Sequence, residues 1–248
     1  MMVRHALGAV VSTALVLSWA APASAYRPFD GTDAAVAEAH VVELEVGPVG
    51  YERQSTAKYL VAPALVLNYG VAPGFELVLE GRQLWALHEP DDSGLEEVAL
   101  SLKSVLRRGS LQGAKGVSVA MESGLLLPGT DARLGVHVAS IFSWQWPAVT
   151  VHLNLMNDLL TSLRYAASSS VIAEGPSQWL VRPVSEVLVV RDFAERAVTR
   201  GSGASVLVGA IAEWNDAWAF DVAVRHGVRE GRTEDEVRLG FTWSFSAE

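Results

Sequence analysis

Apolar residues occupy every second position in about a dozen short runs along the chain. Three clear runs are Tyr59, Val61, Pro63, Leu65, Leu67 and Tyr69; Trp218, Phe220, Val222 and Val224; and Val237, Leu239, Phe241, Trp243 and Phe245. Because successive side chains of a β-strand point to opposite faces, every second residue lies on the same face. The pattern therefore predicts an all-β chain whose strands each have one apolar face.

The runs and the turn-forming residues between them predict twelve strands. They are expected at residues 40–53, 58–69, 75–87, 96–107, 116–127, 133–145, 148–156, 160–173, 178–190, 205–214, 218–229 and 236–246. Short connections rich in Gly, Pro, Asn and Asp alternate with longer loops that hold most of the loop charge. Alternating turns and loops are typical of outer-membrane barrels, so we expect a closed antiparallel up-and-down transmembrane β-barrel of about 12 strands.

The start of the chain has the features of an export signal. Arg4 supplies the positive charge, residues 6–19 are mostly apolar, and Ala23-Ser24-Ala25 is a small-residue cleavage site. We expect export through the Sec pathway and removal of the signal near Ala25. The predicted divisions are a signal peptide at 1–25, an N-terminal lead-in at 26–39 and an outer-membrane β-barrel at 40–248.

The composition excludes several other kinds of protein. The chain has no cysteine, so disulfides do not stabilise it, whereas a closed barrel satisfies its strand edges by hydrogen bonding. The formal net charge of −9 argues against a nucleic-acid partner. After the signal there is no run of about 18 apolar residues, which argues against a helical membrane span.

The strand faces opposite the apolar rows carry charges of both signs. Burying such charges in a dry core costs free energy unless each is paired, whereas a hydrated lumen avoids that cost. The residues predicted to form a lumen charge network are Glu76, Glu80, Arg82, Glu97, Lys103, Arg107, Glu122, His137, His152, Arg182, Glu186, Asp221, Arg225 and Arg238.

Alternation alone fits two barrels: a membrane barrel with its apolar rows outward, and a soluble barrel with them inward. Aromatic residues near the ends of the rows favour the membrane barrel, because Trp and Tyr gather where lipid meets water. The predicted interfacial aromatics are Tyr59, Tyr69, Trp85, Trp144, Trp146, Trp179, Trp214, Trp218 and Trp243.

Short motifs spread over the chain resemble those of one family. They include Arg27-Pro28-Phe29, Asn68-Tyr69-Gly70, Leu127-Pro128-Gly129-Thr130, His152-Leu153-Asn154 and Asp221-Val222-Ala223-Val224-Arg225-His226-Gly227. Together they resemble the transporter-like outer-membrane β-barrel family associated with the phenol-degradation meta-pathway. The resemblance implies a barrel of roughly 12 strands and a channel role. Such barrels commonly end on an aromatic residue, whereas here Ser246-Ala247-Glu248 follows Phe245.

Six of the predicted lumen charges are expected on the inner faces of two adjoining strands. They are Glu76, Glu80, Arg82, Glu97, Lys103 and Arg107. One interpretation is a charged constriction that selects permeants by sign and size. The other is a salt-bridged plug that fills a narrow interior.

His137 and His152 are expected on adjacent strands facing the lumen, with Ser118, Glu122 and Asn154 near them. A serine hydrolase would need one of them as a base with a third partner, and the sequence has no nucleophile elbow. We expect an ordinary hydrogen-bond network, and predict no catalytic residue, metal site or cofactor.

The leading functional hypothesis is an outer-membrane barrel of a Gram-negative bacterium. It would act as a passive pore or transporter component for small molecules, hydrophobic ones included. Its expected partners are outer-membrane lipid and lipopolysaccharide, the barrel-assembly machinery and an unidentified small-molecule permeant. Two alternatives stay open: a closed structural or interaction barrel without transport, and a soluble periplasmic barrel that binds an apolar ligand.

Overall fold

The computed structural model describes residues 27–88, 93–129, 134–161, 164–193 and 202–247. The predicted signal peptide and its cleavage site lie outside the described residues. No helix among the described residues is both long and apolar enough to cross a membrane.

Twelve strands make up nearly all of the regular structure in these residues. They are β1 Val41–Gln54, β2 Ala57–Ala72, β3 Phe75–Ala86, β4 Gly94–Arg107, β5 Ser118–Leu126, β6 Gly135–Gln145, β7 Thr150–Leu160, β8 Tyr165–Glu174, β9 Val181–Asp192, β10 Gly203–Asn215, β11 Trp218–Arg229 and β12 Arg232–Ser246. A single turn of 3-10 helix, η2, spans Ser110–Gln112.

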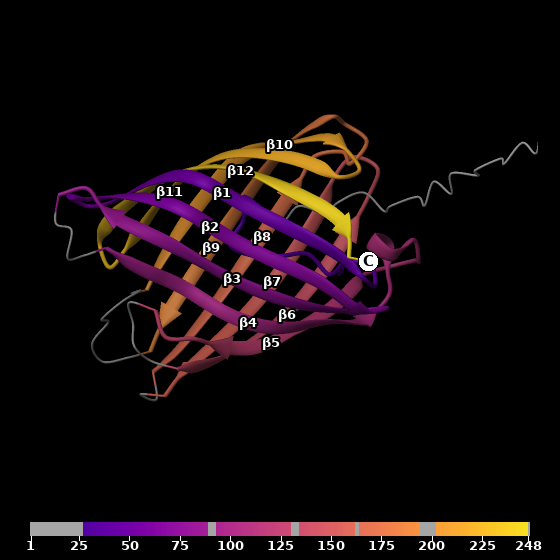
Figure 1. Cartoon of the computed structure of the whole chain (residues 1–248), viewed down its shortest axis with the longest axis horizontal. Helices are drawn as coiled ribbons and strands as arrows, with labels where there is room; N and C mark the ends of the chain where they lie inside the picture. Colours follow the sequence, from indigo (N-terminus) through magenta and orange to yellow (C-terminus); the bar gives the residue numbers. More distant parts are fainter. Residues whose placement is uncertain (1–26, 89–92, 130–133, 162–163, 194–201, 248) are drawn as a thin grey trace, which may run out of the picture.

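Every strand pairs antiparallel with its neighbours in the sequence, and β12 pairs with β1. The sheet is therefore a closed barrel without a free edge, as predicted from the sequence (Figure 1). We call the end where β1 begins, β12 ends and η2 lies the turn end. The opposite end, where β1 continues into β2 and β11 into β12, is the loop end.

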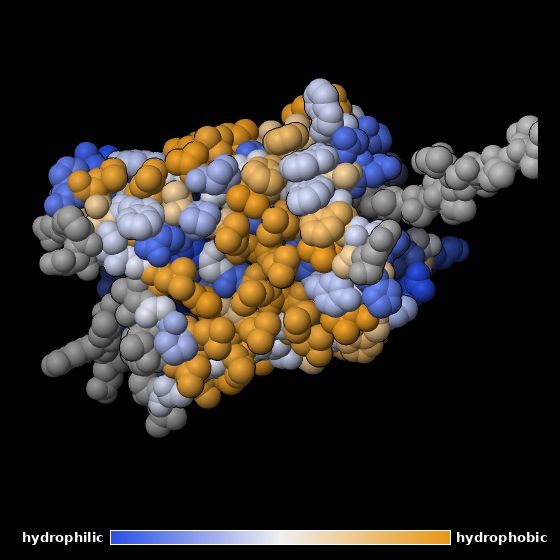
Figure 2. Space-filling model, in the orientation of Figure 1, coloured by the Kyte–Doolittle hydropathy of each residue, from blue (hydrophilic) through white to orange (hydrophobic). Residues whose placement is uncertain are grey.

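The apolar rows face outward, which confirms the membrane orientation expected from the aromatics. Leu79 on β3 is 44% exposed, whereas Glu76 on the same strand is 1% exposed. Figure 2 shows apolar residues gathered over the middle of the visible face, with polar residues toward both ends. A contiguous apolar surface of this size needs lipid around it. This apolar exterior contradicts the alternative of a soluble ligand-binding barrel, whose exterior would be polar.

One predicted apolar row is wrong, because β2 contains an irregularity. The pairing of β2 with β3 shifts by one residue between Val61 and Ala64. As a result Val61 is buried opposite Leu84, while Leu60 pairs with the exposed Trp85. An extra residue reverses which face each side chain takes. Tyr59 and Val61 therefore leave the outward row, and Tyr59 is not part of an outer aromatic girdle.

The outward aromatic residues are unevenly divided between the two ends of the barrel. Most of the predicted set lies at the turn end: Tyr69, Trp144, Trp146, Trp179, Trp214, Trp218 and Trp243. Trp218 stacks on Trp243 with ring centroids 5.5 Å apart. At the loop end Trp85 is accompanied by a stacked pair, Tyr165 and Phe193, with centroids 5.2 Å apart.

Candidate functional site

The candidate site is the lumen at the turn end, where residues 27–38 lie inside the barrel before β1 begins. We call these residues the inner segment; they form turns and bends but no helix or strand. All twelve strands supply at least one inward residue that meets it. In strand order these are Glu45, Gly70, Glu76, Lys103, Ala120, Ser143, Asn154, Ser170, Glu186, Ile211, Asp221 and Arg238.

Backbone amides of the inner segment donate to side chains of the barrel wall. Glu186 accepts two of these bonds, from Asp30 at 3.1 Å and from Gly31 at 2.9 Å. The other four run from Arg27 to Glu45, from Thr32 to Asn154, from Ala34 to Ser143 and from Ala37 to Glu76. A backbone amide that forms no sheet must find another acceptor when buried, and the wall supplies it.

Ion pairs also join acidic side chains of the segment to basic side chains of the wall. Asp30 lies 2.9 Å from Arg225 and 2.8 Å from Arg238. Asp33 lies 3.8 Å from Lys103, which also donates to Thr32 Oγ1 at 3.1 Å. The segment therefore supplies further counter-ions to three wall cations that also pair with wall carboxylates.

The wall leaves room for the segment by means of glycines. A Cβ atom at Gly70 would overlap the backbone of Glu38, and one at Gly240 would overlap the Arg27 side chain. Within the segment, a Cβ at Gly31 would overlap Ser170 Oγ and lie 2.8 Å from Asn154 Nδ2. The segment and the wall are thus in direct contact, with no space between them for a larger side chain.

Two small apolar contacts complete the packing. Phe29 packs on Val184, Ile211 and Ala219. On the other side of the lumen, Ala34 lies in a buried cluster with Ala120, Ala139 and Ile141. Each cluster fixes one part of the segment against the wall, between the polar contacts described above.

The consequence is a lumen closed at the level of the segment. Glu45, Lys103 and Glu186 face inward yet are each only 1% exposed, and Asn154 is 0% exposed. In an open, water-filled lumen such side chains would be solvated. The η2 turn adds to the closure, because Gln112 Nε2 donates to the carbonyl of Ala34 at 2.8 Å.

The six charges expected together on β3 and β4 form two separate groups. Glu76 and Lys103 lie 3.9 Å apart beside the inner segment. Arg82 lies nearer the loop end, where it pairs with Glu52 on β1, Glu96 and Glu97 on β4, and Glu236 on β12. Glu80 lies on the inner face between the two groups, and Glu122 on β5 is in register with Lys103.

Arg107 is not part of the lumen, contrary to the prediction. The pairing of β4 with β5 shifts by one residue between Val105 and Arg107. Ala120 opposite Val105 is fully buried, so Val119, the neighbour that pairs with Arg107, is on the outer face. The extra residue therefore places Arg107 on the exposed side.

His137 and His152 do not form one site, although both face inward. His137 Nδ1 lies 2.6 Å from Asp158 Oδ1, toward the loop end. His152 Nδ1 lies 2.8 Å from Ser143 Oγ, and its Nε2 lies 3.0 Å from Glu174 Oε1. Because Ser143 is six positions further along β6 than His137, the two groups are about 20 Å apart.

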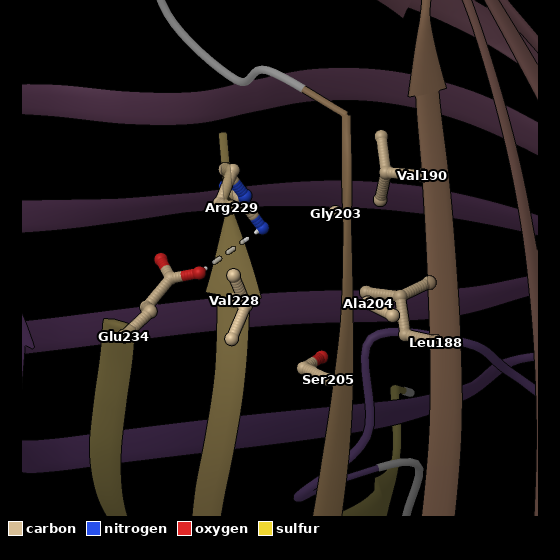
Figure 3. Close-up of a pocket in the computed structure, with 8 residues that line it drawn as sticks. All are labelled: Leu188, Val190, Gly203, Ala204, Ser205, Val228, Arg229 and Glu234. Atoms are coloured by element: carbon tan, nitrogen blue, oxygen red, sulfur yellow. Dashed lines mark ion pairs between the residues drawn. The ribbon is translucent and has the colours of Figure 1, made fainter. Parts of the chain in front are cut away.

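The remaining predicted lumen residues pair with other residues of the wall or with the inner segment. Arg182 pairs with Glu174 at 2.8 Å and also with Glu213. Arg225 pairs with Glu186 at 2.8 Å, and Asp221 with Arg27 of the inner segment at 3.5 Å. At the loop end Arg229 on β11 and Glu234 on the neighbouring β12 lie 3.3 Å apart, on one side of a small pocket that residues of β9 and β10 also line (Figure 3).

The sequence-based prediction missed the inner segment, which it treated as a lead-in. The segment has no period-two alternation, because none of it is a strand. A signal was nevertheless present. Asp30 and Asp33 stand among small residues directly before a barrel whose predicted inner face carries several Lys and Arg residues. Short side chains beside acids are what a narrow charged lumen accommodates.

No family model matches the sequence, and no curated protein matches it. Among solved structures, an outer-membrane channel from Pseudomonas putida F1 has a TM-score of 0.63 at 10% identity, covering 85% of this chain and 97% of that chain. The KdgM porin in complex with disordered oligogalacturonate has a TM-score of 0.56 at 14% identity, covering 82% of this chain and 99% of that one. At these identities the likeness shows a shared outer-membrane barrel fold.

Proposed function

We propose that this protein is a gated passive pore of the outer membrane, and that the inner segment is its gate. One observation carries the proposal. The lumen is closed by a segment that belongs neither to a strand nor to the hydrogen-bonded sheet. Its contacts with the wall are side-chain hydrogen bonds, ion pairs and two small apolar clusters, all of which can break while the barrel remains closed on itself.

The chemistry of the wall favours polar permeants. Most inward side chains that contact the segment are carboxylates, amides, hydroxyls or basic groups, with Ile141 and Ile211 as apolar exceptions, whereas most large apolar side chains of the barrel face outward. Hydrophobic molecules, which the sequence left open, would have to cross this charged lumen. We therefore propose small polar molecules as the permeants.

The surface of the protein supports a proposal for the location and partners of the pore. The outward apolar band requires lipid, and the shared fold is that of outer-membrane barrels. We propose that residues 1–25 direct export and are removed, that the barrel-assembly machinery inserts the chain, and that lipopolysaccharide surrounds its loop end. On the basis of the sequence motifs quoted above, we propose that the chain belongs to the transporter-like family associated with the phenol-degradation meta-pathway.

The pore and its gate can be tested by current recordings in planar lipid bilayers. In Gly31→Leu the added side chain has no room beside Ser170 and Asn154, so it should force the segment out of the lumen. We expect brief openings for the wild-type protein and long-lived openings for the variant. Gly81→Leu is the matched control, because a Cβ at Gly81 makes only ordinary contacts of 3.6 Å or more.

The recordings also separate the pore from the main alternative. The filled lumen is what a closed structural barrel would have, working through its loops or lipid contacts. If Gly31→Leu inserts as a folded barrel but passes no current, the pore proposal is wrong and the structural barrel is favoured.

A further inference from the structure

The backbone of the inner segment presents N–H donors to acceptors of the wall, while its Asp30 and Asp33 side chains pair with wall cations. Six of its backbone N–H groups point at wall acceptors, and three of the five acceptor side chains are carboxylates, Glu45, Glu76 and Glu186. Each of these three is 1% exposed. They come from β1, β3 and β9, so they surround the segment rather than line one side of it.

Two carboxylates of the wall, Glu76 and Asp221, have buried oxygens without a hydrogen-bond partner in the described part of the chain. These oxygens are Glu76 Oε1 and both carboxylate oxygens of Asp221. Glu76 faces Lys103 at 3.9 Å and Asp221 faces Arg27 at 3.5 Å, both longer than a hydrogen bond. A ligand rich in N–H donors would satisfy oxygens that the segment leaves unbonded.

The rest of the wall is acidic as well. Toward the loop end, Arg82 is shared among four carboxylates, Glu52, Glu96, Glu97 and Glu236. Toward the turn end, Arg182 is shared between Glu174 and Glu213. Of the most deeply buried wall residues, seven are carboxylates and three are Lys or Arg: Glu43, Glu45, Glu52, Glu76, Glu186, Asp221 and Glu236 against Lys103, Arg182 and Arg225. Adding Arg82 and Arg238, whose side chains are 13% and 15% exposed, still leaves the carboxylates in excess.

We propose that the carboxylate ring around the inner segment is a binding site for organic cations that carry N–H donors, such as diamines. The inference rests on the proposed pore: when the segment leaves, the ammonium groups of a permeant replace its backbone amides. Charge attracts the cation along the acidic wall, and the hydrogen bonds to Glu45, Glu76 and Glu186 distinguish it from a cation without donors. Wall cations beside the ring, Lys103, Arg225 and Arg238, would limit the site to one small molecule at a time.

The experiment uses full-length Gly31→Leu in planar bilayers. A potassium chloride gradient should give a reversal potential that favours potassium over chloride at least about threefold, as expected of a pore lined by excess carboxylate. We then add 1,4-diaminobutane, or tetramethylammonium at equal charge concentration as the control cation without N–H donors. Diaminobutane should block the potassium current at a concentration about tenfold lower than tetramethylammonium does.

Two further variants assign the effect to the ring. Glu45→Gln in the same background should weaken the diaminobutane block several-fold and leave the tetramethylammonium block nearly unchanged. Glu230→Gln removes a carboxylate of the β11–β12 connection and should alter neither. Current that prefers chloride, or equal block by the two cations, would overturn the inference while leaving the pore intact. An absence of current in every variant would overturn the pore itself, and the inference with it.

Discussion

At the residue scale, Glu186 joins the barrel wall to the inner segment. Its carboxylate accepts from Asp30 and Gly31 and pairs with Arg225, and its side chain is 0% exposed. A buried carboxylate is favourable only when all of its partners are in place. Here two of the three partners belong to the segment, so the position of the segment and the stability of the wall are coupled at this residue.

Replacing Glu186 with alanine should therefore destabilise the folded protein. The change leaves Arg225 buried with fewer counter-ions, and breaking a buried pair in this way costs about 3–5 kcal/mol. Urea unfolding in lipid vesicles measures the loss. Val187→Ala, which alters the adjacent outward side chain, is the control and should cost less than about 1 kcal/mol. Equal losses for the two variants would contradict the role given to Glu186.

At the scale of the strands, most of the fold could be predicted because alternation is local. Each apolar row is contained within a few consecutive residues, so it identifies a strand and its outward face without knowledge of the partner strand. The predictions that were wrong lie where a strand holds an extra residue. Between Val61 and Ala64 and between Val105 and Arg107 the alternation of inward and outward side chains is interrupted. As a result Tyr59 and Arg107 lie on the opposite face from the one predicted. Their residue types do not reveal the interruption, since the shift depends on pairing with a neighbour.

The interruption in β2 can be tested by spin labelling. The chain has no native cysteine, so Leu60→Cys and Val61→Cys each introduce a single labelling position. The nitroxide at position 60 should collide with oxygen dissolved in lipid, and the one at position 61 should be shielded from lipid inside the barrel. Power-saturation electron paramagnetic resonance measures both. A lipid-exposed label at position 61 would restore the uninterrupted row and refute the shift.

At the scale of the whole molecule, the barrel and the inner segment differ in how far they could be predicted. The barrel follows from patterns repeated along the chain, whereas the position of the inner segment depends on contacts between distant residues. Ala34 donates to Ser143, which is 109 positions away, and Asp30 donates to Glu186 across 156 positions. Neither contact leaves a local pattern. From the sequence, a charged constriction and a salt-bridged plug were alternatives. In the structure the inner segment plugs the lumen, and under the proposed function its movement would leave a charged constriction.

The central claim is that movement of the inner segment opens the lumen, and a reversible covalent lock tests it most directly. Ala34 and Ala120 lie in one buried cluster, on the segment and on β5 respectively, so the double variant Ala34→Cys with Ala120→Cys can join the two by a disulfide. Each single variant is a control. Mass spectrometry reports whether the disulfide has formed.

The measurement is the current through bilayers holding the double variant, before and after a reductant is added. We predict no openings under applied voltage while the disulfide is intact, and openings like those of the wild type once it is reduced. The single variants should conduct equally in both conditions. The same current through the oxidised and the reduced double variant would contradict the account, because ions would then be passing with the segment held in place.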